Sequence, residues 1–341
     1  MPHRRDAIAT ISVAMCTFNG QRFLGAQLQS IAAQTRPPDE LVVCDDASSD
    51  GSEQIIKDFS QRVTFPVRTV LNERNLGSTK NFEKAISLCT GKLVVLADQD
   101  DVWYPHKLMR IEDEFRRSAH TLAVFSDADL IDEHSTPLGT RLWDSLEFNR
   151  EEQRAFSRAR ALDVLVKHPV ITGAAMAFRM DLVPLMTPIA QGYVHDYWIS
   201  LWLAARGEIR PISEPLMQYR RHVAQQLGPG PLNLRARVAQ SLLVGAESYL
   251  RQIKLWDELR RALSERRKDL PNADYATNRI NGKIAHLRHR LTLPPTRIAR
   301  IPSILLQALS GNYWRFAMGW NSIAKDFLVD IPERTPSATI C

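Results

Sequence analysis

The chain has 341 residues, of which 44% are hydrophobic and 24% charged, so it is neither collagen-like, low-complexity nor wholly disordered. Its length suits one large α/β domain with an appendage. The formal net charge of +6 is uneven, because residues 231–341 carry about +9 and residues 1–230 about −3. A mildly acidic body argues against nucleic acid as the main ligand, whereas the basic tail leaves contact with an anionic membrane surface open.

The N-terminal residues and the cysteines indicate a reducing compartment. Residues 7–16 form an apolar run that follows a basic start, as in a signal peptide. However, Asp6 stands between the basic residues and the run, and a predicted turn follows the run. We therefore expect a buried strand rather than a signal peptide. No apolar run reaches the roughly 18 residues that span a bilayer. These features predict a cytoplasmic protein. The cysteines lack metal-ligand spacing and are expected to be free, small hydrophobic residues: Cys16, Cys44, Cys89 and Cys341.

The first 130 residues alternate between short apolar runs and stretches with helical periodicity. Apolar runs at 11–16, 41–44, 67–71, 93–97 and 122–125 predict strands, and apolar residues at helical spacing predict helices between them. The run at 93–97 is apolar without alternation, which is typical of a strand covered on both faces. This alternation predicts a parallel, right-handed, doubly wound sheet.

Polar residues gather at the carboxyl ends of these predicted strands, where doubly wound sheets bind their ligands. They are Thr17 and Asn19, then Asp45 and Asp46, then Asn72 and Asn75, then Asp98, Asp100 and Asp101, and after the fifth strand Asp127 and Asp129. Any one of them is also explained by the solubility of a loop. Acidic groups after three strands of one sheet edge would repel each other unless a cation lay among them.

The strongest single motif is Asp98-Gln99-Asp100-Asp101-Val102-Trp103, directly after a predicted buried strand. Hard divalent cations take oxygen ligands and keep positions open for phosphate oxygens. Two carboxylates one residue apart in a tight loop can face one such ion, which neutralises charge on a departing diphosphate. Asp-x-Asp alone is common by chance, but its place at a strand end favours an Mg²⁺ or Mn²⁺ site.

Several separated motifs occur in a fixed order. Residues 13–20 read Val-Ala-Met-Cys-Thr-Phe-Asn-Gly, 34–35 Gln-Thr, 45–51 Asp-Asp-Ala-Ser-Ser-Asp-Gly and 75–77 Asn-Leu-Gly, ahead of the motif at 98–103. Together they resemble the family 2 glycosyltransferases of the GT-A fold, in particular the bacterial rhamnosyltransferase-like branch of surface polysaccharide synthesis. The resemblance covers residues 9–230. It implies a nucleotide-diphospho-sugar transferase domain with a doubly wound mixed sheet, followed by a helical, basic extension at 231–341.

The resemblance implies where the nucleoside and the donor would be held. Asp46 matches the second Asp of the pair after the second strand, which holds the nucleobase. Thr17 and Asn19 match positions that line the nucleoside pocket. Asn75 and Lys80 match positions that face the donor, although Lys80 is also explained as a solvated helix residue.

The resemblance assigns the metal motif to Asp98 and Asp100. Asp100 is the better candidate for direct contact with the ion, and Asp98 also counts among the donor-binding residues. Asp101 either shares this role or caps the following helix. His222, in Tyr219-Arg220-Arg221-His222, resembles a Tyr-Arg-x-His element that reaches the diphosphate or the metal. A purely structural histidine is the alternative. Residues 221, 223 and 224 depart from the pattern common in this branch, so how this loop closes on the donor stays open.

On the acceptor side, residues 171–178 resemble a strand of small residues that walls the acceptor pocket. Asp196 opens an apolar helix and matches the acidic catalytic position of the family. The resemblance therefore implies that Asp196 is the general base that takes the acceptor hydroxyl proton in an inverting transfer. The alternative is an N-cap residue without a catalytic role.

The tail has helical periodicity at 235–267, 280–291 and 304–329, with aromatic residues near its end. It is interpreted either as a helical cap on the catalytic domain or as an amphipathic segment in peripheral contact with the inner face of the cell membrane.

Three functions are weighed. The first is an inverting transfer from a nucleotide diphosphate sugar, with dTDP-L-rhamnose favoured and UDP-hexoses open, to a glycan or lipid-linked acceptor. A nucleotidyltransferase would need a Gly-rich basic loop after the first strand, and residues 17–22 hold one Gly and one Arg. A non-catalytic sugar-binding protein would lack the carboxylates of Asp98, Asp100 and Asp196, which are present.

Overall fold

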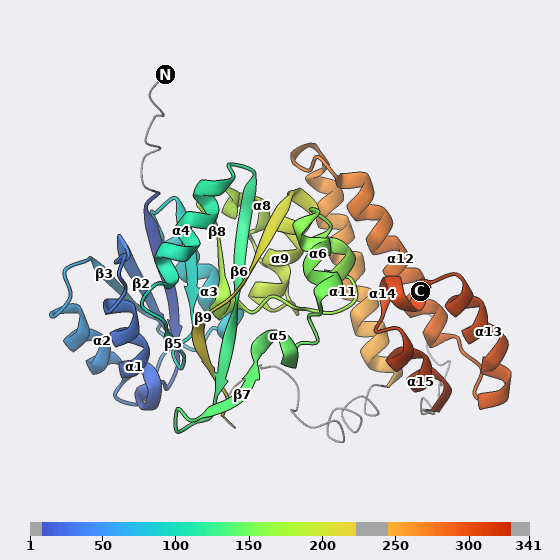
Figure 1. The fold of residues 1–341 in the computed structure, drawn as a ribbon, viewed down its shortest axis with the longest axis horizontal. Helices are drawn as coiled ribbons and strands as arrows, with labels where there is room; N and C mark the ends of the chain where they lie inside the picture. The colour runs from blue at the N-terminus through green and yellow to red at the C-terminus, as the bar shows by residue number, and fades with distance from the viewer. Residues whose placement is uncertain (1–8, 223–244, 329–341) are drawn as a thin grey trace. The chain divides into compact units, whose positions relative to one another are not determined.

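The computed structural model describes residues 9–222 and 245–328. The chain separates into two compact units. The first comprises Met1–Ala161 and Val170–Pro229, and the second comprises Leu162–Pro169 and Gly230–Cys341. Figure 1 shows the labelled helices and strands of both. Residues 223, 224 and 235–244, Val329 and Cys341, on which some of the sequence predictions fall, lie outside the described residues.

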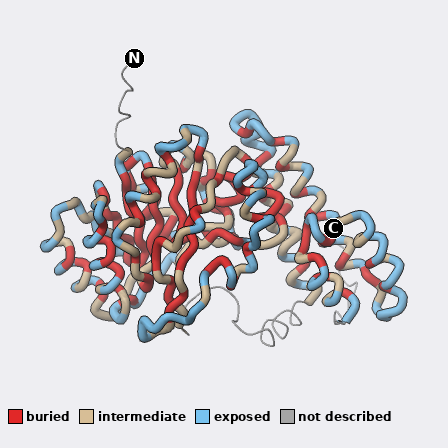
Figure 2. The backbone as a smooth tube through the Cα atoms, in the orientation of Figure 1, coloured by how far each residue is buried: buried red, intermediate tan, exposed pale blue. Residues whose placement is uncertain are grey.

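Four parallel strands form the first half of the sheet. β1 (Ile11–Thr17) pairs with β2 (Glu40–Asp45) and β4 (Leu93–Ala97), and β2 also pairs with β3 (Val67–Leu71). All residues of β1 and β4 are buried, as their unbroken apolar sequences predict, and the sheet is largely red in Figure 2. The predicted alternation is confirmed, with the connecting helices α1 (Gln21–Ala32), α2 (Ser52–Ser60) and α3 (Ser78–Ser87).

The second half of the sheet is mixed. β8 (Met176–Arg179) runs antiparallel between β4 and β6 (Thr121–Ile131), and β9 (Glu208–Arg220) runs parallel to β6. β5 (Val102–Trp103) and β7 (Pro137–Arg141) pair antiparallel with β9 and β6. The wholly parallel sheet predicted from alternation is therefore wrong, because the alternation ends at β6 and the chain returns through β8 in the opposite direction. The mixed sheet implied by the resemblance is confirmed.

β6 is longer than its apolar run predicts. β9 pairs with it from Thr121 to Ile131, so the strand continues through Asp127 and Asp129 instead of ending before them. Asp127 accepts hydrogen bonds from the backbone N–H groups of Ala128 and Trp143, and burial raises its pKa to about 6. Asp129 accepts one from the Tyr104 hydroxyl. The expectation that these acids follow a strand end is therefore wrong.

Residues 171–178 are only partly a strand, because a 3₁₀ turn at Gly173–Ala175 precedes β8. The predicted helix that contains Asp196 is present as α9 (His195–Arg206). The helix after the Asp98 motif is α4 (Lys107–Arg117), and its N-cap is His106, so Asp101 does not cap it. The remaining helices of this part of the chain are short: α5 (Leu142–Ser145), α6 (Arg150–Ser157), α7 (Ala161–Leu165) and α8 (Val183–Met186).

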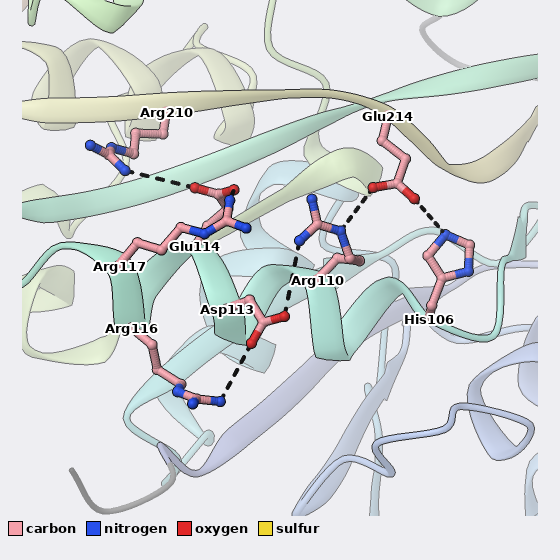
Figure 3. A network of polar contacts seen from close by, with 8 residues as sticks. All are labelled: His106, Arg110, Asp113, Glu114, Arg116, Arg117, Arg210 and Glu214. Carbon is pink, nitrogen blue, oxygen red and sulfur yellow. Dashed lines mark hydrogen bonds and ion pairs between the residues drawn. The ribbon is translucent and has the colours of Figure 1, made fainter. Parts of the chain in front are cut away.

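Ion pairs connect the outer side of α4 to β9 (Figure 3). Arg110 donates to Glu214 at 2.8 Å, and His106 lies 3.2 Å from the same carboxylate. Arg210 of β9 lies 3.7 Å from Glu114, which also pairs with Arg117. Exposed pairs of this kind contribute little each, so the network orients α4 more than it stabilises it.

The second unit is helical, as expected for the extension. Besides most of α7, its described helices are α11 (Ala246–Glu265), α12 (Ala273–Leu291), α13 (Arg297–Leu309), α14 (Asn312–Phe316) and α15 (Trp320–Leu328). The stretch predicted from residue 304 onward is split into α13, α14 and α15. Gly311, with a positive φ of 75°, separates α13 from α14. The extended Ala317 ends α14, and Gly319, with a positive φ of 54°, precedes α15. None of the described helices is both long and apolar enough to cross a membrane.

A buried polar cluster joins the helices of this unit. Arg290 of α12 donates to both carboxylate oxygens of Asp326 at 2.7 and 2.6 Å, and Tyr313 donates to the same carboxylate at 2.7 Å. Lys283 donates to the Phe316 carbonyl at 2.7 Å. Because each of these groups is buried, losing one partner would leave a charge unpaired, so the cluster fixes α14 and α15 on α12.

Candidate functional site

The loop after β1 is held by the loop after β2. The Thr17 hydroxyl donates to Asp45 at 2.6 Å in a buried contact. Asn19, with a positive φ of 48°, donates its backbone N–H to the Ser48 hydroxyl, and its side-chain oxygen accepts from the Ser49 N–H at 2.9 Å. The two predicted nucleoside-binding residues therefore lie together at the carboxyl ends of β1 and β2.

Asp46 organises the loop after β3. Its carboxylate accepts hydrogen bonds from the N–H groups of Leu76 and Gly77 and from Asn72, at 2.8 to 2.9 Å. Asn75 donates to the Asp46 carbonyl at 3.3 Å. A carboxylate offers about four acceptor positions, and three of those of the buried Asp46 are used by these bonds. The structure thus brings Asp46 and Asn75 together.

Gln99 ties the metal-motif loop to the loop after β1. Its side-chain oxygen accepts from the Phe18 N–H at 2.8 Å, and its amide donates to the Phe18 carbonyl at 3.0 Å. A Cβ on Gly20 would lie 2.3 Å from the Gln99 oxygen. Glycine at position 20, whose φ of −93° any residue can adopt, therefore leaves the space that the Gln99 amide occupies, and a larger residue would displace that amide.

Asp98 and Asp101 are the two carboxylates of this loop whose pKa values are raised, in both cases by burial and by the charge of Asp100. Asp98 is half-buried directly after β4, and within the described part of the chain it makes no hydrogen bond or ion pair. Burial and the neighbouring charges of Asp100 and Asp196 raise its pKa to about 8. An unpaired acid among like charges favours a cation, which would hold it ionised.

Asp100 is paired with His222. Nε2 of His222 lies 2.8 Å from Oδ2 of Asp100, and the imidazole lies 5.0 Å from the Phe23 ring. Arg220, buried, donates its Nε to the Asp100 carbonyl at 2.7 Å and its N–H to Asp101 at 3.0 Å. The Tyr-Arg-x-His element therefore closes on the metal motif from β9.

Asp196 lies near enough to Asp98 for its charge to raise the pKa of that carboxyl group. Its Oδ2 accepts from the Gly173 N–H at 2.9 Å and its Oδ1 from the Tyr197 N–H at 2.7 Å. The N-cap of α9 is Val194, so the interpretation of Asp196 as the N-cap is wrong. Its charge raises the pKa of Asp98, so the structure brings the predicted base and the metal motif into one electrostatic neighbourhood.

Lys107 lies fully buried beneath this neighbourhood. Its ammonium donates to the Ala174 carbonyl at 2.8 Å and lies 4.2 Å from the centre of the Trp103 ring. Burial lowers its pKa to about 7, while the charges of Asp101 and Asp98 act in the opposite direction. Lys107 is thus a positive charge that compensates the acidic loop from inside the fold.

Lys80 is not brought to these carboxylates. Its ammonium pairs with Glu83 at 2.5 Å and donates to the Ile189 carbonyl at 3.1 Å. The side chain remains about half exposed, at 49%. The structure therefore uses Lys80 to join α3 to the chain ahead of α9.

The acidic side chains fit a hard divalent cation. Among residues 9–222 and 245–328, no three His, Cys, Asp or Glu side chains converge as a ready set of ligands. Mg²⁺ is usually bound through one or two carboxylates together with substrate phosphates and water, and not by an all-protein cage. Asp98, with its unpaired carboxylate, and Asp100, with one oxygen outside the His222 contact, supply two such groups.

Sequence reasoning missed Gln99, Lys107 and Arg220 as parts of this site. Gln99 is the middle residue of Asp-x-Asp, a position at which the motif allows any residue, so no sequence pattern marks it as part of the site. Lys107 at a helix start is normally a solvated residue, and its burial depends on Trp103 and Ala174 from two other elements. Arg220 stood inside the Tyr-Arg-x-His element, which was the one available signal.

Comparison with known proteins agrees with this geometry. Residues 12–184, about half of the chain, match the family described as glycosyl transferase family 2. An uncharacterised glycosyltransferase of Nostoc sp. is 34% identical over 122 residues, which cover 36% of this chain and 37% of that protein. The Escherichia coli UDP-Glc:alpha-D-GlcNAc-diphosphoundecaprenol beta-1,3-glucosyltransferase WfgD is 30% identical over 98 residues, which cover 29% of this chain and 38% of that protein. The chain thus spans little more than a third of the length of these two curated relatives.

The crystal structure of S. aureus TarS in complex with UDP-GlcNAc superposes with a TM-score of 0.58 at 15% identity, covering 93% of this chain and 88% of that one. The likeness shows a shared GT-A fold. The family match and the fold together place the chain in glycosyl transferase family 2.

Proposed function

We propose that the chain is an inverting glycosyltransferase that moves a sugar from a nucleotide diphosphate donor to a hydroxyl of a glycan or lipid-linked acceptor in cell-surface polysaccharide synthesis. The main support for this proposal is the environment of Asp98. This half-buried carboxylate has no hydrogen-bond or ion-pair partner among the described residues, and the charges of Asp100 and Asp196 raise its pKa. That arrangement suits a cation on one side and a base on the other.

On the donor side, Asp98 and Asp100 would hold Mg²⁺ or Mn²⁺. When bound, such an ion neutralises charge on the departing nucleoside diphosphate. His222 orients Asp100 through the 2.8 Å contact, and Gln99 keeps the loops after β1 and β4 together. We assign the nucleoside to Thr17, Asn19, Asp46 and Asn75.

On the acceptor side, Asp196 acts as the general base. Its two oxygens accept hydrogen bonds from the backbone N–H groups of Gly173 and Tyr197, which fix the carboxylate in place. A carboxylate oriented in this way takes the proton from the acceptor hydroxyl while the hydroxyl oxygen attacks the anomeric carbon and the bond to the nucleoside diphosphate breaks. Attack from the face opposite the leaving diphosphate inverts the configuration, and no covalent sugar–enzyme intermediate is needed.

For the donor, dTDP-L-rhamnose is favoured by the motif pattern of the rhamnosyltransferase-like branch. UDP-hexoses are the alternative, supported by the UDP-Glc and UDP-GlcNAc in the names of the E. coli relative and the TarS structure. A panel of donors read by thermal shift separates them, because a bound donor raises the melting temperature. We place the enzyme in the cytoplasm, where nucleotide sugars would be met, and in peripheral contact with the membrane that carries a lipid-linked acceptor.

The test is the product released when donor, acceptor and Mg²⁺ or Mn²⁺ are mixed with the chain. Transfer releases a nucleoside diphosphate, a nucleotidyltransferase releases pyrophosphate, and a binding protein releases neither. We expect Asp100→Ala and excess chelator to abolish release, and Asp113→Ala on the outer side of α4 to leave it unchanged. Full activity in excess chelator would refute the metal assignment without touching that of the base.

A further inference from the structure

An apolar surface lies exposed on the second unit. Along α13, Ile298, Leu306 and Leu309 are 81%, 65% and 86% exposed, and Leu305 is exposed between them. Trp314 and Trp320, whose rings meet edge to face at 5.4 Å, continue it beyond α13. These six residues define the apolar face. Exposed groups of large apolar side chains usually mark an interaction surface.

The polarity of α13 is the reverse of that of an ordinary surface helix, because an arginine is buried and several aliphatic side chains are exposed. Its buried side carries Arg300 and Ile304, and most of its other residues are exposed (Figure 2). Arg300 donates inward to the carbonyls of Pro294, Pro295 and Asp326, at 2.7 to 3.0 Å. A surface helix normally turns its charges outward and its aliphatic side chains inward. The outward leucines of α13 therefore suit an apolar environment better than water.

The face is held by a firm framework. Figure 1 shows α13, α14 and α15 close to one another in the second unit, and α13 packs against both of the others. Asp326 of α15 is clamped by Arg290 and Tyr313, so the helices beneath the face are fixed to α12. The exposed side chains therefore belong to a packed structure and not to a frayed end.

The charged residues of the stretch that carries the face are nearly all basic. From residue 291 to 328 the sequence holds four basic residues and one acidic residue, Asp326, and that acid is buried. Arg297 and Arg315 are exposed, and Lys325 is half-buried. No exposed acidic side chain therefore lies in this stretch. Aliphatic residues and tryptophan, with basic residues in the same stretch, are typical of helices that lie in the headgroup region of anionic bilayers.

We propose that the apolar face binds the surface of an anionic lipid bilayer, with α13 and the tryptophans in the headgroup region and no helix crossing the membrane. This proposal rests on the proposed function in one respect: a lipid-linked acceptor is the reason for the enzyme to bind a membrane. Transfer to a water-soluble acceptor analogue is measured separately, so that failure of membrane binding and failure of the catalytic assignment are distinguishable.

The experiment is flotation of the full chain with two kinds of vesicle, phosphatidylcholine alone and phosphatidylcholine with about one third phosphatidylglycerol. We expect the chain to float with the anionic vesicles at about 0.05 M salt and to be largely released at about 0.5 M, because salt screens the basic residues. Failure to float with anionic vesicles overturns the proposal. Equal flotation with neutral vesicles overturns the requirement for anionic lipid.

Matched variants locate the surface. Leu306→Glu puts a charge on the apolar face, and we expect binding to fall by about tenfold or more. Leu250→Glu makes the same change on α11, where the side chain is 55% exposed, and should float like the parent chain. Arg315→Gln should weaken binding about fivefold and flatten its salt dependence. Because Leu306 and Leu250 are 65% and 55% exposed, we expect neither replacement to unfold the chain, which circular dichroism checks.

Two results would overturn the assignment of the surface. One is Leu306→Glu and Arg315→Gln both floating like the parent chain. The other is a dimer that Leu306→Glu dissociates, in a chain that ignores anionic vesicles, because the face would then bind a second copy. Transfer to the water-soluble acceptor analogue should be unchanged in all three variants.

Discussion

The Lys107 ammonium donates a hydrogen bond to the Ala174 carbonyl at 2.8 Å, and this contact joins the helix after the acidic loop to the segment that faces Asp196. Ala174 follows Gly173, whose N–H is bonded to the Asp196 carboxylate. One buried side chain thus links the predicted metal side to the predicted base. Lys107 therefore acts as a positioning group and as a buried countercharge.

Replacing Lys107 with Met should raise the concentration of divalent metal that the enzyme needs for activity. Without the ammonium, burial and like charges raise the pKa of Asp98 further, so less of it is ionised at neutral pH. We expect the concentration of Mg²⁺ or Mn²⁺ for half-maximal release of nucleoside diphosphate to rise about tenfold or more. Lys92→Met, the same change at an exposed position, is the control. An unchanged metal titration in Lys107→Met would show that the countercharge has no effect.

Asp196→Asn should lower turnover by roughly 10² to 10⁴, the usual loss for a general base. Donor affinity should hold, because the change lies on the acceptor side. Both Asp196 oxygens accept backbone N–H bonds, and an amide offers only one acceptor, so a small local loss of stability is also expected. Asp181→Asn, an exposed acid nearby in sequence, controls for the loss of charge. Near-normal turnover in Asp196→Asn would assign the base elsewhere.

Gly20→Ala should act through Gln99. The added Cβ would meet the Gln99 side chain at 2.3 Å and displace it, which breaks both bonds to Phe18. We expect Gly20→Ala and Gln99→Ala to weaken donor binding to a similar extent, and the double variant to be no worse than either. Gly25→Ala, where nothing lies within 4 Å of the added Cβ, should leave binding unchanged. Additive losses in a calorimetric titration would contradict this coupling.

Lys283 should make stability depend on pH. Burial and the neighbouring Arg290 lower its pKa from 10.5 to about 7 in the folded chain. Between these values the unfolded chain binds the extra proton, so the free energy of unfolding rises with pH from about 7 upward and falls as pH returns toward 7. One proton contributes a slope of up to about 1.4 kcal/mol per pH unit.

Denaturant unfolding at pH 7 and pH 9 measures this slope. Lys283→Met lacks the titrating group and should show a smaller rise, whereas Lys268→Met, at an exposed position of the same unit, should match the parent chain. Equal slopes in all three proteins would mean that Lys283 keeps its ordinary pKa in the folded state.

Local patterns in the sequence determined the strands β1 to β4, the helices between them and the place of the acidic motif. Unbroken apolar runs and 3.6-residue spacing express which segments are buried, and turn residues express where they end. The motifs around Asp46, Asp98 and Asp196 were therefore placed correctly on elements, and their family could be inferred from the order alone. Their roles stay predictions.

Only the tertiary structure decided what depends on elements distant in sequence. The antiparallel insertion of β8, the extension of β6 through Asp129 and the burial of Lys107 each require a partner from another part of the chain. The tail shows the same limit. Its aromatic residues follow one helical pattern, yet Tyr313 and Phe316 are buried while Trp314 and Trp320 are exposed. Helical periodicity in the sequence indicates that a helix has an apolar side. Only the packing of that helix against its neighbours determines which side is buried.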